Sequence, residues 1–245
     1  VHLHRGYVHP GWRRQGVGTA LLHHAWLRAE ARRLATAAEA PRILATFQLE
    51  SETGGHTLMR RAGYEPIRYN FDMVRNLKAP IPTLPLPEGI EVRPALAEHR
   101  RLIWEAEREA FRDHWAYAPW PEEAYRRFLE FPHYDLSLWR VAWEGDQVAG
   151  SVLSYINQSE NEQHQRRRGH TEDISVRRPW RKRGLARALI SQSLEALKAR
   201  GMDEAVLAVD AENLTGALRV YESLDFVVVK KWTVYQRRLP DAGDL

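Results

Sequence analysis

The sequence predicts a mixed α/β (α+β) fold that occurs twice in the chain, with the first copy incomplete. Three observations support this prediction. A basic, glycine-containing segment occurs twice, and each time an amphipathic helical pattern and a short apolar strand follow it. A proline-rich stretch separates the two copies. The second copy alone has enough alternating strand and helix patterns for a complete domain.

The repeated segment runs from Val8 to Gly18 in the first copy and from Val176 to Ala186 in the second. Helices are predicted after it over 16–34 and 184–200, and strands over 43–49 and 205–209. A second helix and a terminal hairpin are expected to close each copy. The first copy begins inside its fourth strand, so the first three strands of the second copy have no counterpart in it.

Four prolines between residues 80 and 87 mark the boundary between the copies, because proline is excluded from the interior of helices and sheets. We therefore expect a semi-rigid connector at 78–89. It joins a partial, degenerate domain at 1–77 to a complete domain at 90–239, to which we assign the chemistry.

The elements of the complete domain follow from its polarity pattern. Strands are predicted at 90–94, 138–143, 147–155 and 171–176, with a hairpin turn at 144–146. Helices are predicted at 97–112, at 121–131 and from about residue 213, with a polar loop at 157–169. A hairpin of 226–229 with 233–237 ends the domain.

The composition excludes several classes of protein. The 245 residues include no cysteine, so disulfides, a thiol nucleophile and Cys-ligated zinc are excluded, and no metal site is expected. No apolar run is long enough for a membrane span, and we expect a cytoplasmic protein without a membrane partner. The net charge of +4 suits nucleic acid or an anionic cofactor equally. Because the arginines concentrate at the repeated segments, at 166–168 and on helix surfaces, we expect no nucleic-acid partner.

The repeated segment has the properties of an anion site between a strand and a helix. The first N–H groups of a helix are unpaired, and the helix dipole adds positive charge there. Gly184 would let a diphosphate approach the backbone, and small Ala186 would not block it. The proposed residues are Arg181, Lys182, Arg183, Gly184, Leu185 and Ala186, and in the first copy Val8, Arg13, Arg14, Gln15, Gly16, Val17 and Gly18. The alternative is an ordinary turn with solvated basic residues, which the repetition disfavours.

The motif R-x-x-G-x-A, followed by a helix and then by Asn213, Ala217, Tyr221 and Phe226, resembles the signature of the GNAT acetyltransferases. This resemblance implies a tandem GNAT fold with a mixed, mostly antiparallel sheet flanked by helices and opened between its fourth and fifth strands. It also implies acetyl-CoA as donor, held in part by the backbone of Ile174, Ser175 and Val176. Asp225 stands where the family has glycine, so a left-handed turn residue is expected.

The resemblance also implies the catalytic residues. Tyr221 would be the general acid that protonates the leaving thiolate, although it could be a packing residue. Glu172 would be the general base, or else a carboxylate paired with an arginine. His170 shares its face and is the fallback base, whereas strand alternation places Asp173 on the opposite face. Asn213 would hold the pantetheine, or only cap its helix.

The first copy has different residues at the matching positions, namely His4 for Glu172, Ser51 for Asn213 and Met59 for Tyr221. Methionine cannot donate a proton, so this copy is expected to bind CoA at most, in a structural or regulatory role. In the complete copy, Phe111, His114 and Trp115 could line the acceptor cleft or belong to an ordinary helix end. The segment 158–168 could be a lid or merely a hairpin tip.

These observations predict an acetyl-CoA-dependent N-acetyltransferase that transfers an acetyl group to a primary amine of a small molecule by direct attack. The alternative is a non-catalytic acyl-CoA-binding regulatory protein, which Glu172 and Tyr221 disfavour. We expect a monomer or a homodimer in which the two tandem copies pack as a pseudo-dimer.

Overall fold

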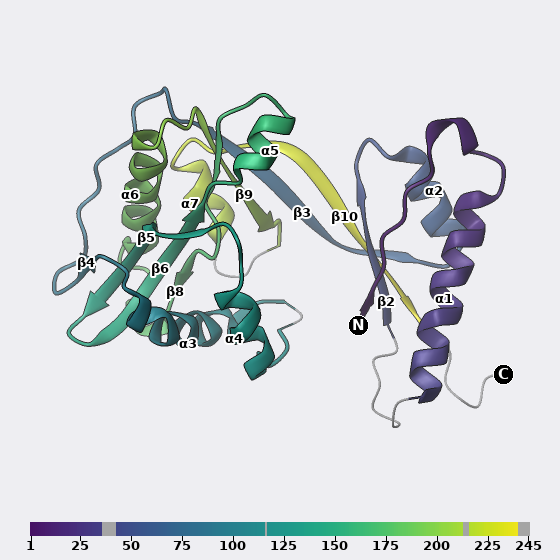
Figure 1. Cartoon of the computed structure of the whole chain (residues 1–245), viewed down its shortest axis with the longest axis horizontal. Helices are drawn as coiled ribbons and strands as arrows, with labels where there is room; N and C mark the ends of the chain where they lie inside the picture. Colours follow the sequence, from purple (N-terminus) through teal and green to yellow (C-terminus); the bar gives the residue numbers. More distant parts are fainter. Residues whose placement is uncertain (36–42, 116, 213–215, 240–245) are drawn as a thin grey trace. The chain divides into compact units, whose positions relative to one another are not determined.

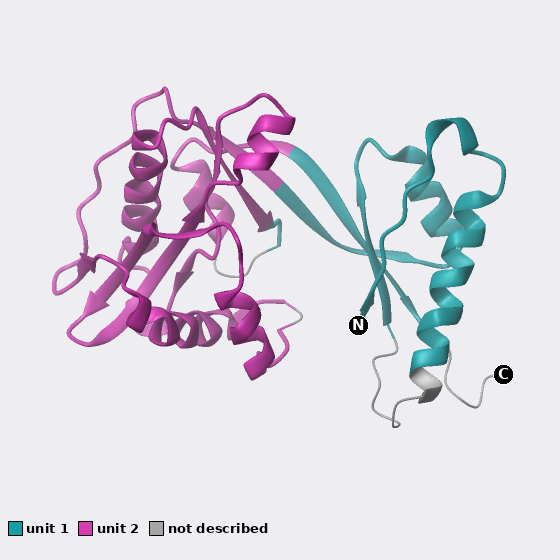
Figure 2. Ribbon diagram, in the orientation of Figure 1, with its two compact units in different colours: residues 1–71, 210–212, 230–245 teal, residues 72–209, 213–229 magenta. Residues whose placement is uncertain are grey.

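The computed structural model describes residues 1–35, 43–115, 117–212 and 216–239. The chain forms two compact units (Figure 2). The first contains residues 1–71, 210–212 and the C-terminal segment from Lys230, and the second contains 72–209 and 213–229. The strands β3 (Glu65–Asn76) and β10 (Val227–Arg238) each supply residues to both units. The division into 1–77, 78–89 and 90–239 follows the sequence repeats and remains a prediction.

The first unit is built around β2 (Ile43–Leu49), at the position predicted for an apolar strand. β2 pairs in parallel with β1 (His2–Leu3) and antiparallel with residues 232–238 of β10. A 3-10 turn (Pro10–Trp12), α1 (Val17–Ala35) and α2 (Thr53–Arg61) complete this unit (Figure 1). Its core is a cluster of buried apolar side chains from both ends of the chain: Ala29, Leu44, Met59, Tyr64, Tyr235 and Leu239.

The second unit contains a sheet with the strand order β9-β7-β6-β5-β4. Its strands are β4 (Glu91–Arg93), β5 (Tyr134–Glu144), β6 (Gln147–Tyr155), β7 (Arg168–His170), β8 (Ser175–Val176) and β9 (Glu204–Asp210). Its helices are α3 (Arg100–Ala110), α4 (Glu122–Leu129), α5 (Gln158–Gln163), α6 (Leu185–Ala199) and α7 (Ala217–Glu222), with 3-10 turns at Ala97–His99, Phe111–Asp113 and Arg178–Trp180.

Helices α3 and α6 pack on opposite faces of the central strand β6. The Ser151 hydroxyl bonds Glu107 on α3, whereas the Ser154 hydroxyl bonds Ser193 on α6. Positions 151 and 154 have opposite parity along the strand, and therefore point to opposite faces. The sheet is mostly antiparallel and flanked by helices, as expected.

Two of the predicted connections are wrong. Neither copy ends in the expected hairpin, because Glu65–Asn76 is one continuous strand, β3, and Val227–Arg238 is another, β10. The polar segment predicted as a loop or hairpin tip contains α5, whose first turn is capped by the Asn157 side chain accepting from the Glu160 N–H at 3.1 Å. The start of the helix predicted near Asn213 lies outside the described residues.

The strand predicted at 171–176 is divided into β7 and β8, and this division opens the sheet. β7 pairs in parallel with β9, and the last bond on that side is from the Thr171 N–H to the Val206 carbonyl at 2.8 Å. Asp173 then takes a left-handed conformation with φ 45°. Among the described strands, β8 pairs only with β6. The sheet therefore opens between β8 and β9, at the place that the family resemblance implies.

The connector at 78–89 has no helix or strand and lies within the second unit, held there by hydrogen bonds of the connector and of the residues just before it. The Leu77 N–H donates to the Asp203 carbonyl at 2.8 Å, and Ser191 donates to the Pro82 carbonyl. Arg75, only 2% exposed, donates to the Pro80 carbonyl and pairs with Asp225 at 3.3 Å. Asp225 has φ 59°, which confirms the expected left-handed turn.

Candidate active site

The two basic segments fold into the same loop, so the sequence repeat is also a structural one. In both copies the loop follows a 3-10 turn, at Pro10–Trp12 and Arg178–Trp180. Arg14 and Lys182 have φ of 64° and 61°, and Gly16 and Gly184 have φ of 83° and 84°. A helix begins directly after each glycine.

The mouth of α6 has the features of an anion site. Gly184 is the N-cap residue of α6, and no side chain caps the helix there. A Cβ at Gly184 would meet no atom within 4 Å, so the space over the loop is open. The unpaired N–H groups of the first turn and the exposed Lys182 side chain provide positive potential at this opening.

Arg181 holds the loop in place. Its guanidinium donates to the Val176 carbonyl at 2.9 Å, the Ala110 carbonyl at 3.0 Å and the Asp113 carboxylate at 2.6 Å. Arg178 binds the same carboxylate, and together these arginines hold the pKa of Asp113 well below its usual range. The sequence analysis predicts Arg181 as a phosphate ligand, but its guanidinium is bound by protein atoms. The role of Asp113 as the partner of these arginines was not predicted, because Asp113 belongs to no motif.

Arg183 is also engaged by protein atoms, since it donates to the Glu88 carbonyl of the connector at 2.8 Å. Within the described chain, Lys182 and the backbone amides are therefore the groups of this loop that are most open to an anion.

Glu172 lies between β7 and β8, where the sheet opens, and its charge influences Tyr221 of α7. Its backbone carbonyl accepts from the Leu153 N–H of β6 at 3.0 Å, which fixes the residue to the sheet. Burial, with Asp173 and Asp72 as negative neighbours, raises the pKa of Glu172 to about 8. In the part of the chain that the structure describes, no arginine forms an ion pair with Glu172. The alternative prediction, a carboxylate paired with an arginine, is therefore not observed there.

Tyr221 is 7% exposed and packs edge-on against Phe226, with ring centroids 6.1 Å apart. Burial, and then the negative charge of Glu172, raises the pKa of its phenol. The phenol is therefore protonated at neutral pH. The structure thus brings the two residues that sequence analysis selected as base and acid into one electrostatic environment.

Further polar groups beside Glu172 were not predicted. The Tyr134 hydroxyl donates to Asp173 at 2.7 Å, so Asp173 is held against β5. Glu107 of α3 is 1% exposed and accepts from the Ser151 hydroxyl at 3.0 Å. Ser151 in turn lies 3.0 Å from Ser175 of β8. Local sequence patterns could not predict this cluster, because its members come from α3, β5, β6, β8 and the segment between β7 and β8.

The remaining predicted residues are the fallback base, the acceptor residues and Asn213. The His170 ring stacks on Tyr155 at 4.5 Å and lies 3.3 Å from Glu160, and burial lowers its pKa. Phe111 packs against His114 and Trp120, and Trp115 is 40% exposed. Asn213 lies outside the described residues.

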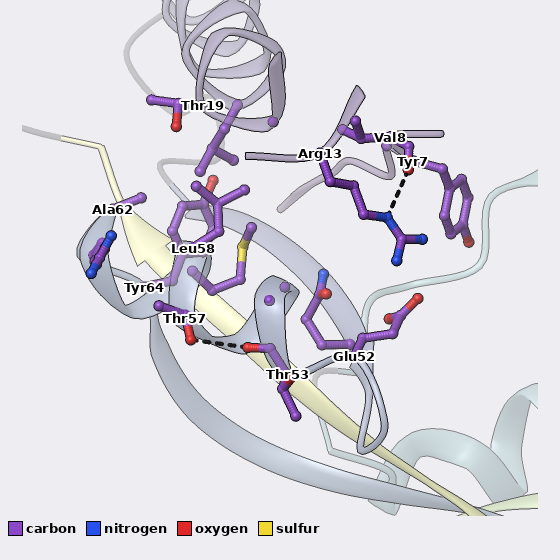
Figure 3. Close-up of a pocket in the computed structure, with 18 of the residues that line it drawn as sticks. Tyr7, Val8, Arg13, Thr19, Glu52, Thr53, Thr57, Leu58, Ala62 and Tyr64 are labelled. Carbon is purple, nitrogen blue, oxygen red and sulfur yellow. Dashed lines mark hydrogen bonds between the residues drawn. The ribbon is translucent and has the colours of Figure 1, made fainter. Parts of the chain in front are cut away.

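The first unit has a pocket of about 1070 Å³ at its own basic loop (Figure 3). Arg13 donates to the Val8 carbonyl at 3.2 Å, matching the contact of Arg181 in the second copy. Met59, 5% exposed, also lines the pocket. His4 lies 2.9 Å from the Tyr64 hydroxyl, and burial lowers the pKa of His4 and raises that of Tyr64 to about 12.

An open, positively charged helix mouth, an opened sheet and a buried carboxyl and phenol are together typical of transferases that act on nucleotide-linked acyl groups. Two family models match the chain: the acetyltransferase (GNAT) family over residues 100–226 and the acetyltransferase (GNAT) domain over residues 1–66. The chain belongs to the GNAT acetyltransferase family and is an N-acetyltransferase with two GNAT domains.

Similar proteins agree with this assignment. The chain is 31% identical over 230 residues to the mycothiol acetyltransferase of Thermobispora bispora, covering 93% of this chain and 72% of that protein. A crystal structure of a GCN5-related N-acetyltransferase from Sphaerobacter thermophilus matches with a TM-score of 0.81 and 31% identity, covering 98% of this chain and 73% of that chain. A tandem GNAT protein from the clavulanic acid biosynthesis pathway shares the fold, with a TM-score of 0.71, 17% identity and coverage of 96% and 74%.

The described residues contain no candidate membrane span and no candidate metal site. No helix there is long and apolar enough to span a membrane. No group of three or more His, Cys, Asp or Glu side chains there is arranged to hold a metal ion.

Proposed function

We propose that the second GNAT domain transfers an acetyl group from acetyl-CoA to a primary amine of a small molecule by direct attack. The observation that carries this proposal is the electrostatic interaction between Tyr221 and Glu172, which lies where the sheet opens. One is a carboxyl with a pKa of about 8, and the other is a buried, protonated phenol.

Glu172 would act as the general base. An alkyl amine has a pKa of about 10.4, so nearly all of it is protonated at pH 7 and must lose a proton before it attacks. A carboxyl with a pKa of about 8 is a much stronger base than an ordinary glutamate and is still partly ionised at neutral pH. The proton would pass from the ammonium to Glu172, directly or through one water.

Tyr221 would act as the general acid. The acetyl thioester supplies the activated acyl carbon, and the thiolate that leaves it needs a proton. The raised pKa of Tyr221 keeps its hydroxyl protonated until that step. No described residue accepts a hydrogen bond from the Tyr221 hydroxyl. This hydroxyl would therefore be available to protonate the leaving thiolate.

The donor would be held by the α6 mouth and by the edge of β8. The first N–H groups of α6, with Gly184 and Lys182, would bind the diphosphate. Ile174, Ser175 and Val176 would contact the pantetheine arm along the open edge. Arg181 would act indirectly by holding the loop.

In the first domain, the loop from Val8 to Gly18 and its pocket would hold a second CoA. Met59 supplies no proton there, and His4 is already hydrogen-bonded to Tyr64. The first domain would therefore bind CoA without catalysing acetyl transfer by the same acid and base.

The acceptor would enter near the end of α3, where Phe111, His114 and Trp115 lie. The relatives named mycothiol acetyltransferase support a small-molecule acceptor. The acceptor should be sought in a panel of small primary amines that includes amino sugars, diamines and aminoglycosides.

The experiment measures free-thiol release from acetyl-CoA over this amine panel for the wild type, Glu172→Gln and Tyr221→Phe. We expect amine-dependent release that falls about 10²-fold or more in each variant. Tyr69→Phe, at an exposed tyrosine of the first unit, is the matched control and should retain full activity. CoA binding without release for any amine would refute the proposal and favour a non-catalytic acyl-CoA-binding role. Full activity of both variants would refute the assigned residues.

A further inference from the structure

We propose that Asp173, held by Tyr134, is a positioning residue for Glu172, fixing both the direction and the charge environment of the Glu172 carboxylate. This inference rests on the proposed function, because it takes Glu172 as the base. The sequence analysis predicted no role for Asp173 or Tyr134, and it expected Asp173 on the face of a regular strand opposite to that of Glu172.

The backbone provides the first argument. Asp173 has φ 45°, a conformation that residues other than glycine rarely adopt and that the surrounding structure must maintain. The chain is fixed on both sides of it. The Glu172 carbonyl accepts from Leu153, and Ser175 pairs with Ser151 in the ladder of β8 with β6. The change of direction is therefore concentrated at Asp173, next to the base.

The contact with Tyr134 provides the second argument. The Tyr134 hydroxyl donates to Asp173 Oδ2 at 2.7 Å. The tyrosine ring is itself held edge-on by Trp139, with centroids 5.1 Å apart, and by Phe128 at 5.2 Å. A donor on a fixed ring keeps the Asp173 side chain in one place. Burial raises the pKa of Asp173, and the hydrogen bond from Tyr134 opposes this shift by favouring the ionised form.

The charged and titratable groups around the base provide the third argument. Glu172 faces Asp173 on its own segment, Asp72 of β3, Tyr155 of β6 and Tyr221 of α7. Asp173 in turn faces Glu107 of α3 and Tyr134 of β5. The acidic neighbours of Glu172 disfavour its ionisation, so they make it a stronger base. Asp173 is the nearest of them in the chain, and its position depends on the Tyr134 contact.

The test compares Asp173→Asn and Tyr134→Phe with the wild type. Asn keeps the shape of the side chain, accepts the Tyr134 bond and tolerates a left-handed backbone, but it removes the charge. Phe removes only the hydroxyl that holds Asp173. Thiol release with the best amine is measured from pH 5 to 10, and a thermal melt of each variant checks folding.

We expect Asp173→Asn to move the acidic limb of the kcat/KM profile down by about one pH unit, because a like charge next to Glu172 has gone. Tyr134→Phe should move it in the same direction by less. In both variants kcat should fall about tenfold while the KM for acetyl-CoA stays within about twofold, because a positioned base is lost and donor binding is not. Glu195→Gln, exposed on α6, is the control that should change neither.

The outcomes separate this inference from the proposed function. If Glu172→Gln retains full activity, the proposed base is wrong and the inference falls with it. If Glu172→Gln is inactive, but folded Asp173→Asn and Tyr134→Phe keep the wild-type limb, the inference alone is overturned. Lower melting temperatures with an unchanged limb would also overturn it, since they would show a structural role only. Tyr134→Phe keeps the test decisive if Asp173→Asn fails to fold.

Discussion

Replacing Glu172 by Gln should stabilise the second unit at alkaline pH and leave its stability almost unchanged at acid pH. The reason is linkage. A carboxyl whose pKa is higher in the folded chain than in the unfolded chain holds its proton more tightly when folded. Below the unfolded pKa the group is protonated in both states. As the pH rises, the unfolded chain ionises first, so stability falls until the pH exceeds the folded pKa.

The magnitude follows from the environment of this carboxyl. Its pKa is raised from 4.5 to about 8. At about 1.4 kcal/mol for each of these 3.5 pKa units, the cost of ionising it in the folded chain reaches an upper limit of about 5 kcal/mol above pH 8. Gln is uncharged at every pH and avoids this cost. For a chain of this size, this upper limit corresponds to a Tm gain of at most about 10–20 °C at pH 9.

The assay is thermal unfolding of the wild type and Glu172→Gln at pH 5, 7 and 9, followed by circular dichroism. Glu195→Gln makes the same change at an exposed position of α6 and should show no pH-dependent gain. A gain for Glu172→Gln that is equal at pH 5 and pH 9, or a loss at pH 9, would refute the reasoning, because the carboxyl would then not be disfavoured in its charged form.

Three further perturbations test other parts of the structure. Gly150→Ala would place a Cβ 2.5 Å from the Ser175 carbonyl, so it should lower the free energy of unfolding by about 1–3 kcal/mol and reduce kcat/KM; a variant with wild-type urea unfolding would contradict this. Arg75→Met should cost about 2 kcal/mol in the same measurement, because it leaves the Pro80 carbonyl without its charged donor; an unchanged midpoint would show that this contact contributes little. Arg14→Ala should weaken CoA binding to the first domain only, so that calorimetry detects two sites in the wild type and one strong site in the variant; identical isotherms would argue against the second site.

The repeated loop could be predicted from the sequence because its geometry is local. Gly16 and Gly184 mark positions of positive φ, and basic residues precede both. β2 and β6 were predicted at the bounds the structure shows, since their apolar pattern and turn signals are also local. The opening of the sheet could be foreseen only from the family resemblance.

The errors arose where tertiary contacts decide the conformation. Asp173 accepts a hydrogen bond from Tyr134, 39 residues away, and takes a left-handed conformation that alternation along a regular strand does not predict. β10 reads as a hairpin because polar Lys230 and Lys231 interrupt its apolar pattern, yet the ladder with β2 keeps residues 232–238 extended. Asp113 was missed as a partner of the loop arginines because nothing in its local sequence indicates it.

The ladder between β2 and the end of β10 has a consequence for biosynthesis. Residues 43–49 are translated well before residues 232–238, the strand segment that covers one of their edges. Until then β2 has an open edge that can pair with other chains. A fragment that lacks residues 232–238 should therefore aggregate unless this strand is supplied in trans, and deletions within these residues should first damage the fold around β2.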